Sequence, residues 1–123
     1  MGATNNGRVP AINPRVLDDL RSIQAGTPGF LAELIDQFLR EAVVLIARLR
    51  EALAARDVRG FEQAAGALKG SCGNLGAQAM SRMCVDLQLA SHGGDWPRVA
   101  RLLEGLEGEF RLVESELDVE KRR

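Results

Sequence analysis

The chain has few of the residue types on which most functional sites depend. Its 123 residues include no tyrosine, one tryptophan, two cysteines and one histidine. Aromatic residues make up only 4%, which argues against a β-sandwich and against aromatic platforms that stack nucleic-acid bases. Cys72 and Cys84 have no second Cys or His pair nearby, so the spacing of a metal site is absent. We therefore expect two small buried thiols, no metal and no cofactor.

Charge of one sign and long apolar runs are also missing. Sixteen basic and 17 acidic residues give a formal net charge of −1, so there is no broad basic surface and we expect no nucleic-acid partner. The longest apolar run, Ala42 to Ala47, is far shorter than the roughly 18 to 20 residues that span a membrane. No charged segment followed by an apolar one opens the chain, so we expect no membrane insertion and a cytoplasmic location.

The apolar residues that are present recur at helical spacing. Asn13-Pro14 and Thr27-Pro28 each place proline after a capping residue, which predicts two helix starts. Further helices are expected from about 57 to 74 and from about 77 to 91, and Asp95 is expected to cap a last one. That last helix has an apolar seam with spacings of 4, 3, 4, 3 and 4 residues: Val99, Leu103, Leu106, Phe110, Val113 and Leu117.

No alternation typical of strands competes with this pattern. The sequence therefore predicts an all-α fold, an antiparallel four-helix bundle with a short N-terminal cap helix. We expect the bundle to span residues 12–119. Residues 1–11 are polar and glycine-rich, which predicts a flexible tail, and the charged residues 120–123 are expected to form a frayed end.

The third long segment carries glycines on one side of its predicted helix. Each helical residue advances about 100°, so one side collects the apolar residues Phe61, Ala64, Ala65, Leu68, Cys72 and Leu75. The other side, which we call the glycine face, consists of Glu62, Gly66, Lys69, Gly70 and Gly73. A glycine within a helix costs roughly 1 kcal/mol relative to alanine. Three glycines on the solvent side therefore indicate that a partner approaches this backbone closely.

The stretch from Ala65 to Ala77 resembles the signature of histidine-containing phosphotransfer (HPt) domains of phosphorelays, approximately A-H-x-L-K-G-S-x-x-x-L-G-A. The matching residues are Leu68-Lys69-Gly70-Ser71 and Leu75-Gly76-Ala77, and the similarity extends to the helix order and the overall length. In that family an exposed histidine takes a phosphoryl group from a receiver-domain aspartate and passes it to another. The resemblance implies that the partners are a response-regulator receiver domain and a hybrid sensor histidine kinase.

The chain departs from the family pattern at Gly66, which matches the phosphoacceptor histidine. Glycine has no side chain, so phosphotransfer at this position is chemically impossible and we do not expect an enzyme. The resemblance places Lys69 beside the phosphoryl group as a point cation, and Gly70 leaves room for the partner. Two explanations stay open: a natural relative that lacks the acceptor, or a histidine that was deliberately replaced by glycine.

Three further residues have simpler interpretations. His92 is expected to cap a helix end, where a cation is favoured, rather than to serve as a relocated phosphoacceptor. Ser71 is expected to bond a backbone carbonyl one turn back, and Gly73 to relax the helix end. The alternative function is a non-catalytic scaffold or dimerisation bundle, in which the glycine face packs against a second copy, although we expect a monomer.

Overall fold

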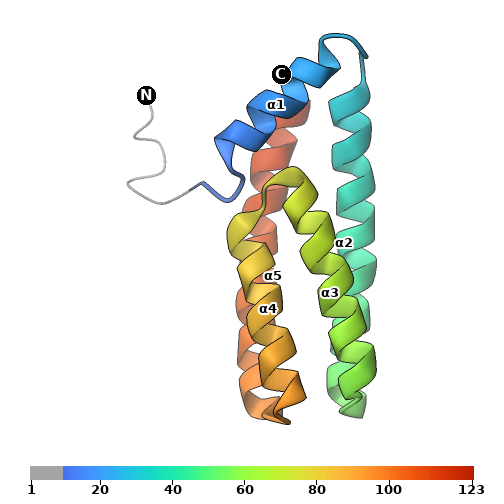
Figure 1. Cartoon of the computed structure of the whole chain (residues 1–123), viewed down its shortest axis with the longest axis vertical. Coiled ribbons are helices and arrows are strands. Elements are labelled where there is room, and N and C mark those ends of the chain that lie inside the picture. Colours follow the sequence, from blue (N-terminus) through green and yellow to red (C-terminus); the bar gives the residue numbers. More distant parts are fainter. Residues whose placement is uncertain (1–9) are drawn as a thin grey trace.

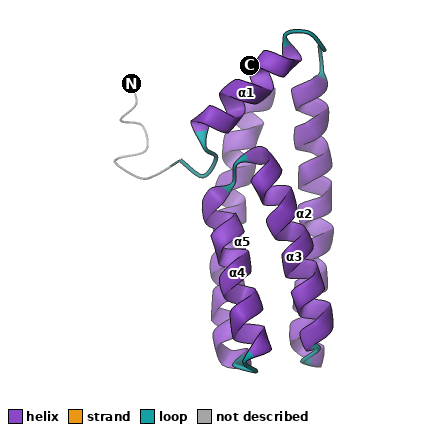
Figure 2. Ribbon diagram, viewed as in Figure 1, coloured by secondary structure: helices purple, strands orange, loops and turns teal. Residues whose placement is uncertain are grey.

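The computed structural model describes residues 10–123, which form five helices joined by short turns (Figures 1 and 2). The helices are α1 (Pro14–Gln24), α2 (Phe30–Ala55), α3 (Val58–Leu75), α4 (Gln78–His92) and α5 (Trp96–Lys121). No strand occurs in this range, and none of its helices combines the length and the apolar character needed to cross a membrane. The all-α prediction is confirmed. Most of the predicted tail, residues 1–9, lies outside the described residues.

Helices α2 to α5 form the bundle, and each of them packs against two neighbours: α2 and α4 both contact α3 and α5. Helices α2 and α5 have 26 residues each, whereas α3 and α4 have 18 and 15. The turn between α3 and α4 therefore stops short of the end that α2 and α5 reach. Helix α1 lies across this step and closes the bundle, as expected for a cap helix (Figure 1).

The contact between α1 and the α3–α4 turn depends on Gly76. The backbone N–H of Asn13, the N-cap of α1, donates to the carbonyl of Gly76 at 2.8 Å. Gly76 has a φ of 79°, and a Cβ there would lie 2.8 Å from Cβ of Val16. Both the left-handed backbone and the close approach of α1 therefore require glycine at this position.

The residues just before α1 are also fixed to the bundle. Ala11 and Ile12 are buried, and their backbone N–H groups donate to the two carboxylate oxygens of Glu116 on α5 at 2.7 and 2.9 Å. These contacts satisfy two backbone donors that precede the first helix. The bundle thus includes Ala11, one residue before its predicted boundary.

Helical spacing identifies most of the core correctly. All six predicted apolar residues of α3 and all six of the α5 seam are buried. On α4 the inward-facing residues are Met80, Cys84 and Leu87. The apolar spacing of α1 would bury Ile23, but this residue is 52% exposed. On α2 the helical spacing allows either Val43 or Ala42 to face the core, and the buried residue is Ala42, whereas Val43 is 56% exposed.

Helix α2 begins later than Thr27-Pro28 predicts. Its first residue is Phe30, and its N-cap is Gly29, which has a φ of 84° and no side chain to accept a bond. The side chain of Gln24 instead accepts the backbone N–H of Leu31 at 2.9 Å. A residue from the preceding helix therefore takes the capping role that the sequence assigned to Thr27.

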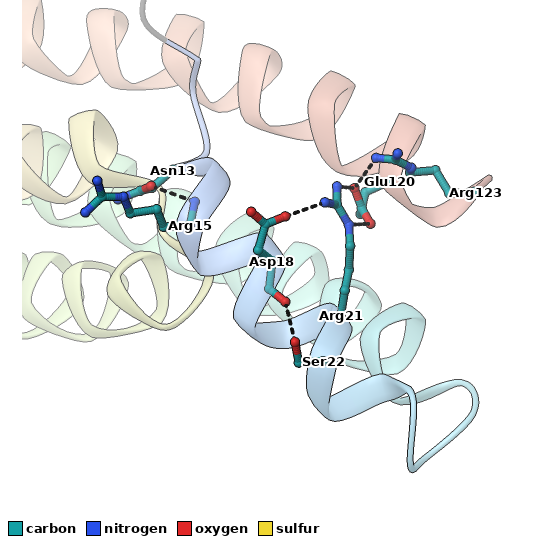
Figure 3. Close-up of polar contacts among 7 residues, drawn as sticks. All are labelled: Asn13, Arg15, Asp18, Arg21, Ser22, Glu120 and Arg123. Atoms are coloured by element: carbon teal, nitrogen blue, oxygen red, sulfur yellow. Dashed lines mark hydrogen bonds and ion pairs between the residues drawn. The ribbon is translucent and has the colours of Figure 1, made fainter.

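The C-terminal end of α5 is anchored by an ion pair. Helix α5 continues through Lys121, past the predicted boundary at 119, and Glu120 is buried. Nε and Nη2 of Arg21 donate to the two carboxylate oxygens of Glu120 at 2.8 and 2.5 Å, and Arg21 also pairs with Asp18 (Figure 3). Lys121 adds an ion pair to Asp36 of α2. Three helices are thus joined by charges at this end of the bundle.

The Arg21–Glu120 pair predicts a dependence of stability on pH. Hydrogen bonding to Arg21 holds the pKa of Glu120 below its ordinary value, although burial opposes this shift. The folded chain therefore binds this proton less tightly than the unfolded chain, whose glutamate pKa is about 4.3. The stabilisation is present above that value and is lost as the pH falls through the lower pKa of the folded state.

We expect Glu120→Gln to lower the free energy of unfolding at pH 7 by about 1–2 kcal/mol, a modest value because the Arg21 side chain is 35% exposed. The difference from the wild type should shrink as the pH falls below about 4. Urea unfolding at pH 7 and pH 3 measures both effects, with the exposed Glu114→Gln as the matched control. An equal loss at both pH values would contradict a role for the charge.

Candidate functional site on helix α3

Helix α3 is oriented by contacts at both of its ends. The Asp57 side chain caps its first turn by accepting the N–H of Gly60 at 3.0 Å. Near the start of the core side, the rings of Phe61 and Trp96 meet edge to face, with centroids 6.2 Å apart. At the far end Gly76 is the C-cap. With its apolar side buried between α2 and α4, α3 leaves the opposite side on the surface.

The glycine face lies on that surface, as the sequence predicts. Lys69, Gly70 and Gly73 are exposed, and Glu62 and Gly66 are partly buried. Lys69 forms no ion pair within the described residues, so its ammonium group is available to a partner. The structure therefore places all five predicted residues along one side of one helix.

Neither Gly70 nor Gly73 is required by the fold. A Cβ at either position would have no neighbouring atom within 4 Å, and neither has a positive φ. Gly73 lies in the last turn of α3, which continues through Leu75, and the glycine that terminates the helix is Gly76. Both exposed glycines thus lower the stability of the helix without an internal reason.

Gly66 differs from the other two glycines because it faces α4. A Cβ at this position would lie 3.2 Å from Nε2 of Gln88, and this amide donates to the carbonyl of Glu62 at 3.2 Å. The neighbour is the far end of a flexible side chain, so a small shift of Gln88 would admit a larger residue. Sequence reasoning missed Gln88, whose only signal is that it precedes His92 by one helical turn.

His92 lies on the same side of the molecule as the glycine face. Nδ1 of its imidazole lies 3.1 Å from Oε2 of Glu62, and the His92 side chain is 79% exposed. It is the last residue of α4, whose C-cap is Gly93. His92 therefore lies at the helix end, as expected, and in addition contacts α3. A residue that looked remote from the motif in sequence lies beside the glycine face in space.

The groove between α2 and α3 borders the glycine face on its other side. It has a volume of about 480 Å³, and Val44 within it is 50% exposed. Ser71 donates to Oε1 of Glu41 across it at 3.3 Å, which corrects the expected bond to a backbone carbonyl. Apolar and cationic groups share the groove: its lining residues are Arg40, Glu41, Val44, Leu45, Arg48, Ala67 and Ser71.

The two cysteines do not contribute a nucleophile. Cys72 and Cys84 are unpaired and fully buried, as the sequence predicts. Contact with the Cys84 side chain, together with burial, raises the pKa of the Cys72 thiol. A thiol is reactive as the thiolate, so Cys72 acts as a core residue.

Known proteins share this architecture. A crystal structure of histidine-containing phosphotransfer protein B from Pseudomonas aeruginosa PAO1 superimposes with a TM-score of 0.82 and 27% identity, covering 94% of this chain and 98% of that one. The maize protein ZmHP2 gives a TM-score of 0.83 at 23% identity, covering 89% and 82% of the two chains, and shows the shared fold.

Sequence comparison agrees with the structures. Histidine-containing phosphotransfer protein 2 of Arabidopsis thaliana is 25% identical over 103 residues, which are 80% of this chain and 66% of that protein, so the chain spans just under two thirds of this relative. The model of the Hpt domain family matches residues 33–117, well over half of the chain. This match, together with the five-helix bundle, shows that the chain belongs to the Hpt domain family.

Proposed function

We propose that the chain is a phosphorelay module that docks response-regulator receiver domains through the glycine face and carries no phosphoryl group at position 66. The receiver domain would belong to a response regulator or to a hybrid sensor histidine kinase. The two unpaired cysteines fit a reducing compartment such as the cytoplasm.

The observation that carries this proposal is the open space above Gly70 and Gly73. Glycine at an exposed position within a helix costs roughly 1 kcal/mol relative to alanine, and nothing inside the protein requires it at either place. A partner whose loops approach the α3 backbone would require it, because any side chain there would hold the partner away.

The surroundings of these glycines suit the surface of a receiver domain. Lys69 lies one turn after Gly66 without an acidic partner among the described residues, and the adjoining groove offers Val44 between Arg40 and Arg48. The partner in a phosphorelay presents an aspartate at its active site. Cations beside an apolar contact therefore provide charge complementarity and buried area on the same side.

We expect Gly70→Leu to weaken binding to a receiver domain by at least about tenfold, because a branched side chain on the open face blocks close approach. Gly108→Leu is the matched control, since Gly108 also lies within a long helix, α5, with no atom within 4 Å of a Cβ. Isothermal titration calorimetry of both variants against a receiver domain that binds the wild type measures the difference.

Equal affinity of the two variants would contradict docking through the glycine face. Sedimentation velocity of the same samples tests the alternative, the dimerisation bundle. A wild-type dimer that Gly70→Leu dissociates and Gly108→Leu leaves intact would favour the bundle over the receiver dock.

A second experiment asks whether the rest of the site could support phosphotransfer if position 66 carried a histidine. We expect Gly66→His, in a His92→Gln background, to take up phosphate from a phosphorylated receiver domain, because the imidazole would project beside Lys69 once Gln88 moves. Radiolabel transfer followed by peptide mapping locates the product. Gly66→Gln in the same background is the control, with a side chain of similar size and no nucleophile.

Absence of label in a folded Gly66→His variant that still binds the receiver would show that the rest of the site does not support phosphotransfer. That result would favour a natural relative whose site has changed beyond the missing histidine. Uptake of label would show that position 66 alone accounts for the loss.

A further inference from the structure

The only histidine of the chain, His92, lies where α3 and α4 meet, near Gly66. Its Nδ1 atom is 3.1 Å from Oε2 of Glu62, and Glu62 precedes Gly66 by one helical turn, about 6 Å along α3. Gln88, which covers Gly66, is one turn before His92 on α4. The imidazole therefore lies beside α3 at Glu62, the residue one turn before Gly66.

The contact with Glu62 determines which ring nitrogen is nucleophilic. An ionised carboxylate only accepts hydrogen bonds, so Nδ1 must carry the proton that lies between the two groups. In the neutral ring the lone pair is then on Nε2. The side chain is 79% exposed, and Nδ1 is the ring atom with a partner among the described residues. Nε2 is therefore open to an incoming electrophile.

The same carboxylate suits the charge that a reaction at Nε2 would create. When Nε2 forms a bond to phosphorus, the ring becomes cationic while the Nδ1 proton stays in place. Glu62 lies at hydrogen-bond distance from that proton and stabilises the cation, as carboxylates do for the imidazolium of other His–carboxylate pairs. Glu62 acts here as a positioning residue and His92 as the group that reacts.

We propose that His92 is an accessory phosphoacceptor, modified at Nε2 by an acyl phosphate. The assignment of the donor to the aspartyl phosphate of a docked receiver domain rests on the proposed function. The Nε2 lone pair forms the N–P bond, the P–O bond to the aspartate breaks, and its electron pair leaves with the carboxylate. No proton is gained or lost, because the Nδ1 proton remains held by Glu62.

The first test uses potassium phosphoramidate, a small phosphoryl donor that needs no docking. We expect one acid-labile phosphoryl group per chain, located at Nε2 of His92 by phosphorus NMR and peptide mapping, and none in His92→Gln. Glu62→Ala should slow the modification at least about tenfold and spread it over both ring nitrogens. The exposed Glu114→Ala is the control.

Nitrogen NMR of the imidazole provides a readout that a purely structural role would not change. We expect the wild type to show the proton on Nδ1, Glu62→Gln to retain this tautomer through its amide oxygen, and Glu62→Ala to lose it. Modification of the wild type at the rate of N-acetylhistidine, or equal rates in the wild type and Glu62→Ala, would overturn the proposed site.

The second test uses a phosphorylated receiver domain that calorimetry shows to bind the wild-type chain. Label that appears on His92 supports the transfer, and binding without label on His92 overturns it. If no receiver domain binds, the proposed function fails, whereas the phosphoramidate experiment still decides whether Glu62 and His92 form a phosphoacceptor site.

Discussion

The rotation of α3 about its own axis is the constraint on which the site depends. Helix α3 packs against both α2 and α4, and the six side chains that it buries occupy one continuous side. Turning the helix by one residue position would expose part of the apolar side to water and bury the charged side chain of Lys69. Each of these changes would destabilise the folded state. Because the core fixes the rotation, the remaining side faces outward with its three glycines in line. None of the six buried residues belongs to the glycine face.

The different lengths of the helices explain why so many polar contacts gather at one end of the molecule. Because α3 and α4 are shorter than α2 and α5, the bundle would leave apolar residues uncovered where the α3–α4 turn ends. Helix α1 covers that end, and Gly76 allows it to approach. Glu116 accepts hydrogen bonds from the two residues before α1, and Glu120 accepts them from Arg21 in the last turn of α1. These contacts stabilise this end of the fold, and none of them involves the middle of α3.

The core could be predicted from the sequence because it follows the helical repeat, which is a local property. The caps at Asn13 and Asp95 are local for the same reason, and the structure confirms both. The errors arise where one helix contacts another. Gln24 replaces Thr27 at the start of α2, Glu41 binds Ser71, and Glu62 binds His92. Each of these pairs joins separate helices, and a repeat within one helix contains no information about such distances.

The surroundings of Gly66 also bear on how the bundle accommodates glycine at this position. Gly66 is not among the buried residues of α3, so glycine at this position removes no side chain from the core and costs about the helix propensity of one residue. The fold therefore tolerates glycine here at a small cost in stability. The side-chain amide of Gln88 lies over Gly66, and the imidazole of His92 on α4 contacts Glu62, one turn before Gly66. Since α3 and α4 are held together by the core that fixes the rotation of α3, Glu62, Gly66 and His92 keep fixed positions relative to one another.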